Sequence, residues 1–274
     1  MYVTISPDGV SSVSIDSLES RFDREIERLG VRIKDVNQLK VRQDVFDEVT
    51  LLALYKLVHK GWITAMGGSI STGKEANVFF GERGDQNLAI KIYRIRTANF
   101  NAMSEYLIGD RRFSSIRRTR KDIVFTWTKK EFSNLKRAHA VGLPVPLPMI
   151  FDRNILIMEF LGEAEHPYPQ LRNVELPDPD AVYEEIVLFI KTLYSEAELV
   201  HADLSEFNIL YSDRPYVIDM GQAVTLDHPK ARPFLVRDIA NVNRYFGNLC
   251  PVRPEREIFA EITGFSGTGN QVTM

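Results

Sequence analysis

Residues 201–208 read H-A-D-L-S-E-F-N, so a carboxylate, Asp203, lies five residues before a carboxamide, Asn208. A second aspartate, Asp219, comes eleven residues after Asn208 and directly follows the apolar run 216–218. Phosphoryl transfer needs little covalent help from a protein, because its barrier falls chiefly when the nucleophile is positioned and phosphate charge is neutralised. Asp203 suits the first task. Asn208 and Asp219 suit the second, since their hard oxygens favour Mg²⁺ over zinc.

Each of the two aspartates has a simpler explanation when it is considered alone. An aspartate often caps the first turn of a helix, and another often follows a strand in a turn. The combined pattern H-x-D-x-x-x-x-N followed by D-x-G, in this order and at this spacing, is instead the signature of protein kinases. We therefore predict Asp203 and Asp219 as catalytic residues, and Asn208 and Asp219 as metal ligands.

A lysine upstream of this pattern, Lys91, lies within the strand-like run 88–93 in the sequence A-I-K. It matches the V-A-I-K element of kinases, whose lysine binds the α- and β-phosphates of ATP and pairs with a glutamate on the next helix. Glu131 is the predicted partner, because it lies on the helical segment that follows. The alternative is that both residues are ordinary surface charges.

A glycine turn, residues 68–76, reads G-S-I-S-T-G-K-E-A. It is neither G-x-G-x-x-G nor a Walker loop, because Glu75 stands where the Walker pattern requires serine or threonine. Its backbone amides, the hydroxyls of Ser71 and Thr72 and the ammonium of Lys74 can still surround a triphosphate. A plain hairpin turn is the alternative interpretation.

Apolar periodicity predicts the elements that position these residues in the first half of the chain. Spacings of three and four indicate helices at 16–29 and 44–60, and residues 2–15 form a hairpin or a tail. Short apolar runs separated by glycine predict three antiparallel strands, at 63–66, 76–80 and 88–93. A basic segment, residues 94–121, follows with eight Lys or Arg against two acids, and we predict a long connection without regular structure.

The second half of the chain is predicted to be mainly helical. Helices are expected at 125–140, at 181–196 and beyond Val236, with a strand at 155–160 and two short strands around 213–215. The fold class is therefore α+β, with a β-rich N-terminal lobe and a trimmed α-helical C-terminal lobe. We expect an N-terminal extension with an added helical element at 1–44, the N-terminal lobe at 45–158, and the hinge and C-terminal lobe at 159–274.

The composition excludes several classes of protein. The 274 residues are 44% hydrophobic and 26% charged, with a formal net charge of −3, which is typical of a globular protein. No apolar run approaches the roughly 20 residues that a membrane helix needs. Cys250 is the only cysteine, and no leader pattern precedes the first helix. We expect a cytoplasmic protein without disulfides or membrane contact.

Three stretches, 71–76 (S-T-G-K-E-A), 199–208 and 218–223 (I-D-M-G-Q-A), together resemble the RIO family of atypical protein serine kinases. The form of the motifs is similar to the first subfamily and its archaeal branch, and the resemblance covers residues 45–246. It implies a two-lobed kinase fold without the usual activation loop and substrate-docking helices. It also implies a hinge at 158–162, where Glu159 and Leu161 offer backbone groups to adenine.

The resemblance further implies ATP-dependent phosphorylation of serine or threonine, ATP hydrolysis with Mg²⁺ or Mn²⁺, and a role in maturation of the small ribosomal subunit. Asp219 is expected to be a transient phosphate acceptor as well as a ligand. Within the basic segment, Ser114, Ser115 and Thr119 lie among arginines and are candidate autophosphorylation sites. We also expect this segment to contact precursor ribosomal RNA through its phosphates.

Two alternatives stay open at this point. Small-molecule phosphotransferases of the aminoglycoside-kinase type carry a similar catalytic loop, although they need a larger C-terminal helical region for the acceptor. The other alternative is a nucleotide-gated assembly factor, whose slow turnover only times its release from a particle.

Overall fold

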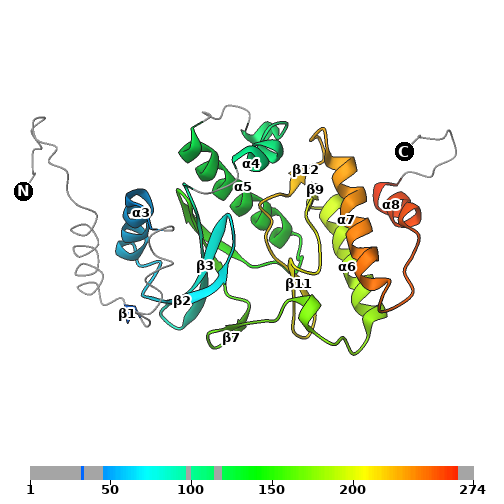
Figure 1. Cartoon of the computed structure of the whole chain (residues 1–274), viewed down its shortest axis with the longest axis horizontal. Coiled ribbons are helices and arrows are strands. Elements are labelled where there is room, and N and C mark those ends of the chain that lie inside the picture. Colours follow the sequence, from blue (N-terminus) through cyan, green and yellow to red (C-terminus); the bar gives the residue numbers. More distant parts are fainter. Residues whose placement is uncertain (1–31, 34–45, 97–99, 114–118, 265–274) are drawn as a thin grey trace, which may run out of the picture.

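The computed structural model describes residues 32–33, 46–96, 100–113 and 119–264, which form two lobes. Figure 1 shows a sheet with helix α3 at one end of the long axis and helices α6, α7 and α8 at the other. This arrangement confirms the predicted α+β class with a β-rich and an α-helical lobe. The hairpin or tail at 2–15 and the helix at 16–29 lie outside the described residues.

The sheet of the N-terminal lobe has six strands in the order β1-β2-β3-β4-β6-β5. All neighbours are antiparallel except the pair β1–β2, which is parallel. The three predicted strands correspond to β2, β3 and β4, and the predicted strand at 155–160 corresponds to β6. The bounds are β1 Arg32–Ile33, β2 Ala65–Thr72, β3 Ala76–Arg83, β4 Gln86–Tyr93, β5 Pro148–Asp152 and β6 Ile155–Glu159.

Two helices cover opposite faces of this sheet, because side chains alternate between the faces along each strand. Helix α3, Glu48–His59, begins at Asp47, whose carboxylate accepts the N–H of Thr50 at 2.9 Å. Its apolar side packs in one cluster with Ile90 and Ile92 of β4. Helix α5, Arg120–Ala140, packs in another cluster that contains Ala89. The neighbouring Lys91 follows the same alternation and faces the cleft side of the sheet.

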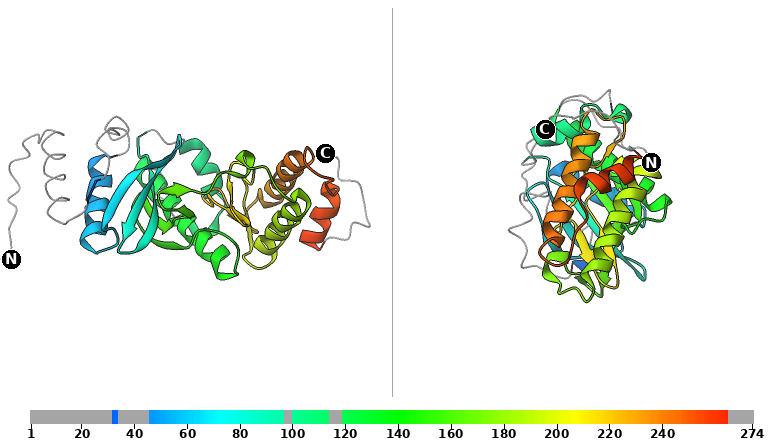
Figure 2. Two further views of the ribbon diagram at one scale, coloured as in Figure 1. Left: turned by 90° about the horizontal axis from the view of Figure 1, so that it is seen from below. Right: turned by 90° about the vertical axis from the view of Figure 1, so that its right-hand side faces the viewer.

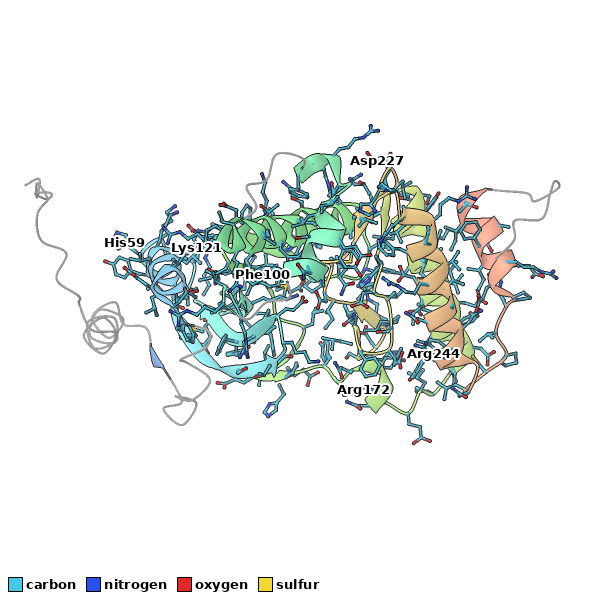
Figure 3. The ribbon with its side chains drawn as sticks, turned by 45° about the horizontal axis from the view of Figure 1, so that its top comes forward. His59, Phe100, Lys121, Arg172, Asp227 and Arg244 are labelled. Atoms are coloured by element: carbon cyan, nitrogen blue, oxygen red, sulfur yellow. The ribbon has the colours of Figure 1, made fainter. Side chains whose placement is uncertain are left out.

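The basic segment contains regular structure, so the prediction of an irregular connection is wrong for its described part. Helix α4, Phe100–Leu107, and the short helix η2, Arg111–Phe113, lie between β4 and α5. Met103, Leu107 and Phe113 are buried in a cluster with Trp127 of α5. In Figure 3, Phe100 and Lys121 mark the two ends of this packed region. The arginines dominate the composition here, but the apolar residues determine the structure.

Three helices form the body of the C-terminal lobe: α6, Pro179–Ser195, α7, Ala231–Phe246, and α8, Glu255–Thr263. Figure 2 shows them grouped beside one another. Short elements connect this body to the cleft: β7 Gly162–Glu163, β8 His166–Pro167, η3 Leu171–Asn173, β9 Leu199–Val200, β10 Ile209–Tyr211, β11 Pro215–Val217 and β12 Val224–Thr225. Strands β10 and β11 are the predicted pair around residue 213. In the described part of the chain, none of the helices combines the length and apolar character needed to cross a membrane.

Candidate functional site

A cleft of about 1160 Å³ lies between the lobes, and residues from both lobes line it. The segment 68–76 forms part of its wall; in the structure it comprises the end of β2, a turn at 73–75 and the first residue of β3. The hinge after β6 forms another part. The predicted chemical residues of both lobes also line the cleft: Lys91, Asp203, Asn208 and Asp219. The structure therefore brings the separate sequence motifs to one site.

Lys91 connects the two lobes across this cleft. Its ammonium lies 2.7 Å from Oε1 of Glu131 and 2.9 Å from Oδ1 of Asp219. Glu131 is fully buried, and the hydroxyl of Tyr93 donates to its other oxygen. Burial opposes the charge of Lys91, but the Asp219 and Glu131 carboxylates outweigh it and raise the Lys91 pKa well above its ordinary value. Lys91 is therefore a permanent cation at the floor of the cleft.

Asp203 lies on the opposite side of the cleft in the catalytic loop, residues 201–208. The side-chain amide of Asn208 donates to the Asp203 main-chain carbonyl at 2.8 Å and to its Oδ2 at 3.2 Å. The amide of Gln222 donates to the same Oδ2 at 2.9 Å. Burial and then the nearby charge of Asp219 raise the Asp203 pKa to about 6. Asp203 is thus a carboxylate whose proton affinity suits general-base chemistry near neutral pH.

The oxygens of Asn208 and Asp219 fit a hard divalent cation. The amide nitrogen of Asn208 is occupied by Asp203, so its carbonyl oxygen is the atom that remains for a cation. The Asp219 side chain is 48% exposed, and the ammonium of Lys91 outweighs the opposing effect of burial and lowers its pKa. No group of three or more His, Cys, Asp or Glu in the described ranges could hold a metal alone. Two protein oxygens are typical of a cation shared with phosphate oxygens.

The backbone of the catalytic loop adopts a costly conformation that nearby side chains stabilise. Ala202 has a φ of 66°, in the left-handed region that non-glycine residues rarely adopt. The two carboxylate oxygens of Asp238 accept the N–H groups of Ala202 at 2.7 Å and Leu204 at 3.0 Å, and Arg237 donates to the Ala202 carbonyl. Asp238 is only 1% exposed, and burial raises its pKa to about 7. Sequence reasoning missed this anchor.

His201 connects the catalytic loop to the strand before Asp219. Its Nδ1 accepts the N–H of Asp203 at 3.3 Å, and its Nε2 lies 3.4 Å from the carbonyl of Ile218. This geometry assigns the proton to Nε2, which donates to Ile218. Burial lowers the His201 pKa to about 4, so the ring is neutral at physiological pH and serves as a structural link.

Helix α5 fixes the metal loop, which we define as residues 219–223. The amide of Asn134 donates to the carbonyls of Met220 and Ala223, each at 2.8 Å. The ammonium of Lys130 donates to the carbonyl of Gly221 at 2.7 Å and also to that of Ala223. Lys130 is fully buried, and this burial lowers its pKa to about 7. The helix that carries Glu131 therefore holds Asp219 through the backbone as well as through Lys91.

The glycine turn places some of its predicted phosphate-binding residues on the cleft, but not all of them. Ser71, Lys74 and Glu75 line the cleft wall. Among the described residues of the turn, Thr72 is not part of that wall, and its hydroxyl lies 3.3 Å from that of Ser69. Ser71 and Thr72 are consecutive residues of β2, so their side chains point to opposite faces of the strand. The sequence pattern alone does not show which of the two faces the cleft.

Glu159 and Leu161 lie in the hinge on the cleft wall, as the sequence predicts. The N–H of Glu159 donates to the carbonyl of Leu147 at 2.9 Å, and the carbonyl of Leu161 accepts the N–H of Tyr168 at 3.0 Å. The protein therefore uses one backbone group of each residue. The other backbone groups of these two residues are the Glu159 carbonyl and the Leu161 N–H, one acceptor and one donor.

Two of the candidate autophosphorylation sites, Ser114 and Ser115, lie outside the described residues. Thr119 is described, and it caps helix α5. Its hydroxyl accepts the N–H of Asp122 at 3.2 Å and lies 2.6 Å from the Asp122 carboxylate. Phosphorylation of Thr119 would therefore require this cap to open.

The chain matches the family model described as the RIO domain over residues 77–257. It is 42% identical over 260 residues to the RIO-type serine/threonine-protein kinase Rio1 of Haloferax volcanii, covering 94% of this chain and 89% of that protein. The corresponding protein of Methanocaldococcus jannaschii is 36% identical, with coverage of 90% and 86%. The serine/threonine-protein kinase RIO1 of Caenorhabditis elegans is 38% identical, and the chain spans 52% of its length.

A crystal structure of the Rio2 kinase-ADP/Mg²⁺-phosphoaspartate complex from Chaetomium thermophilum matches with a TM-score of 0.60. The match covers 80% of this chain and 67% of that one at 23% sequence identity, so it supports the fold alone. The family model spans more than half of the residues, and curated relatives share over 30% identity along most of the chain. This chain belongs to the RIO family.

Proposed function

We propose that this protein is an ATP-dependent serine/threonine protein kinase of the RIO type, with ATPase activity. The observation that carries the proposal is the position of Lys91, which lies between Glu131 and Asp219 at 2.7 and 2.9 Å in the cleft that also contains Asp203. This is the arrangement that an active kinase requires, because the lysine, its glutamate and the metal-binding aspartate must be in place together. The related archaeal proteins are named as serine/threonine kinases.

In this proposal each cleft side chain has a separate role in phosphoryl transfer. Lys91 binds the α- and β-phosphates, and Asp203 orients the acceptor hydroxyl. The acceptor oxygen attacks the γ-phosphorus, the bond to the β–γ bridging oxygen breaks, and ADP leaves with that electron pair while Asp203 takes the hydroxyl proton. Asn208 and Asp219 would hold Mg²⁺, which neutralises phosphate charge when it is bound. Mn²⁺ suits the same oxygen ligands.

The remaining cleft residues bind the two ends of ATP in this proposal. The Glu159 carbonyl and the Leu161 N–H bind the adenine edge, which offers one donor and one acceptor. Ser71 and Lys74 approach the phosphates from the glycine turn. Thr72 is not included, because its hydroxyl faces Ser69.

A single-turnover experiment with γ-labelled ATP tests this function. We expect Mg²⁺-dependent transfer of label to serine or threonine in the protein, together with slow release of labelled phosphate. Acid-stable label identifies phosphoserine or phosphothreonine, and acid-labile label identifies an aspartyl phosphate such as that proposed at Asp219. Absence of both transfer and release at saturating ATP would contradict the proposal.

We also propose that the partner is a precursor of the small ribosomal subunit in the cytoplasm, and that the basic segment contacts its RNA. Not every arginine of the segment is available for this role. Arg94 donates to Asn77 at 2.8 and 3.1 Å, and Arg112 donates to Asp110 and Asn134. Arg111 is 85% exposed, and within the described ranges its ion pair is with an exposed acid, Asp227, at 3.2 Å. Its cationic group therefore faces solvent, where an RNA phosphate can replace the carboxylate.

Replacing Arg111, Arg117 and Arg118 with glutamine should flatten the salt dependence of RNA binding. Each lost phosphate contact lowers the slope of log K against log salt by about 0.7 to 0.9, so three lost contacts change it by about two to three. Binding to precursor particles would be measured between 50 and 200 mM salt, roughly the range over which such contacts weaken. ATP affinity should stay nearly constant.

Arg112→Gln is the matched control for this test. It removes one positive charge from the same segment but breaks the contacts to the buried Asp110 and Asn134, so we expect lower thermal stability with an unchanged salt slope. If the triple variant keeps the wild-type slope, the segment is not the RNA contact.

A further inference from the structure

One oxygen of the Asp203 carboxylate receives both of its side-chain hydrogen bonds. Gln222 donates to Oδ2 at 2.9 Å, and Asn208 donates to the same Oδ2 at 3.2 Å. Within the described part of the chain, Oδ1 accepts no hydrogen bond. A carboxylate on a single Cβ–Cγ bond rotates through broad wells, so two donors on one oxygen fix the direction of the other.

We propose that Gln222 is a positioning residue for phosphoryl transfer, because it holds the Asp203 carboxylate with Oδ1 toward the acceptor hydroxyl. This inference rests on the proposed kinase function and assigns a role to a residue of the metal loop that does not bind the metal. Gln222 acts through Asp203 and does not touch the reacting atoms. Its contribution is to orient Asp203. Correct orientation of the nucleophile removes a large part of the activation free energy of an in-line attack.

Gln222 is better suited to this task than Asn208. The Asn208 amide also bonds the Asp203 main-chain carbonyl at 2.8 Å, and its oxygen is a proposed cation ligand, so its orientation responds to nucleotide and metal. Gln222 projects from a backbone that is fixed independently of the nucleotide. Lys130 holds the carbonyls of Gly221 and Ala223 on either side of it. The orientation of Asp203 therefore depends on helix α5.

The neutral amide of Gln222 also suits the electrostatics of the site. Asp203 faces the charge of Asp219, which disfavours its ionised form. An arginine or lysine at position 222 would stabilise Asp203 but would also compete with Lys91 for phosphate. A carboxamide donates a hydrogen bond without adding charge, so it stabilises the carboxylate and leaves phosphate binding to the cations already present.

The test uses two substitutions of similar size, Gln222→Met and Gln222→Glu, in the full-length protein. We expect Gln222→Met to lower kcat at saturating Mg-ATP by about tenfold to a hundredfold, as is typical for a lost hydrogen bond to a charged group. Gln222→Glu should be lower still, because an ionised carboxylate cannot donate and repels Asp203. ATP Kd should stay within about twofold in Gln222→Met.

Asn241→Leu is the matched control, because the Asn241 amide supports the same loop at the Leu204 carbonyl, 3.2 Å away, without contacting Asp203. It should lower thermal stability and leave kcat within about twofold of wild type. A residue that only fills space would keep kcat near the wild-type value as Met, which has a similar volume, so wild-type kcat in Gln222→Met would overturn the proposal. Unchanged kcat in both Gln222 variants, or an equal loss in Asn241→Leu, would also overturn it. If wild type itself transfers no phosphate, the kinase function fails and this inference falls with it.

Discussion

Replacing Asp203 with alanine should lower phosphoryl transfer by two to four orders of magnitude while ATP affinity stays within about tenfold. Asp203 lines the cleft, and its carboxylate accepts hydrogen bonds from Asn208 and Gln222. Its proposed interaction with the acceptor forms only as the hydroxyl loses its proton. Loss of this interaction therefore raises the activation free energy of phosphoryl transfer without removing a contact to the nucleotide.

Two measurements on one preparation check this expectation. Single-turnover transfer from γ-labelled ATP gives the rate, and equilibrium binding of a fluorescent ATP analogue with Mg²⁺ gives the affinity. Asp203→Asn is the control for packing, because it keeps the shape but lacks the charge, and we expect it to be nearly as slow as alanine. Equal losses of rate and affinity would show that Asp203 holds nucleotide instead of orienting the acceptor.

Replacing Asp219 with asparagine should largely remove the effect of Mg²⁺ on ATP binding and abolish detectable turnover. The substitution removes a hard anionic ligand, and it also removes one of the two carboxylates that pair with Lys91, leaving Glu131 at 2.7 Å. In wild type, adding a chelator should weaken ATP binding by at least about tenfold, a change of about 1.4 kcal/mol. In the variant, binding should be weak with or without chelator.

Asp227→Asn provides a matched control for this experiment. Asp227 follows the metal loop by a few residues but pairs with Arg111 outside the cleft, at 3.2 Å. Its substitution removes the same charge and should leave the chelator effect intact. Nucleotide affinity that is indifferent to chelator in wild type would refute the assignment of Asp219 and Asn208 as ligands. A lack of acid-labile phosphate on wild type after ATP treatment would limit Asp219 to the ligand role.

The sequence was sufficient to predict that the proposed reacting groups lie together, because their spacing is short and their types are distinctive. Asp203 and Asn208 share one loop, and the loop geometry alone brings their side chains into contact. Glu131 could be predicted because Lys91 requires an acid and helix α5 offers one near its centre, although helix α4 lies between them in the chain. The contact between Lys91 and Asp219 spans 128 positions, yet both residues belong to motifs whose joint occurrence implies it.

The supporting residues could not be found in the same way. Lys130 and Asn134 donate hydrogen bonds to main-chain carbonyls that are 86 to 93 residues away. Every residue has such a carbonyl, so the sequence does not indicate which ones accept these bonds. Asp238 did leave a signal. It is an acid on the buried face of a helix that also carries Leu235 and Ile239, and such a residue needs buried donors. Gln222 had no comparable pattern.

The errors in the predicted fold have physical causes as well. Phe100, Met103 and Leu107 have the spacing of an amphipathic helix, but the many arginines around them indicated an irregular connection. Strand β5 was missed because it begins at Pro148, after a proline-rich stretch. Proline is tolerated there since β5 is an edge strand of the sheet and Pro148 is its first residue.

The attachment of the metal loop to helix α5 has a consequence for inhibitor design. Compounds that gain selectivity by displacing this loop from the cleft must break the four hydrogen bonds from Lys130 and Asn134 to its carbonyls. Each such bond contributes about 1 kcal/mol, and the Lys130 ammonium would be left buried without partners, which costs more. The loop also packs closely on helix α5 at Gly221, where an added Cβ would lie 2.8 Å from the Trp127 ring. Medicinal chemistry on this protein is therefore better directed at the adenine end of the cleft, between Glu159 and Leu161.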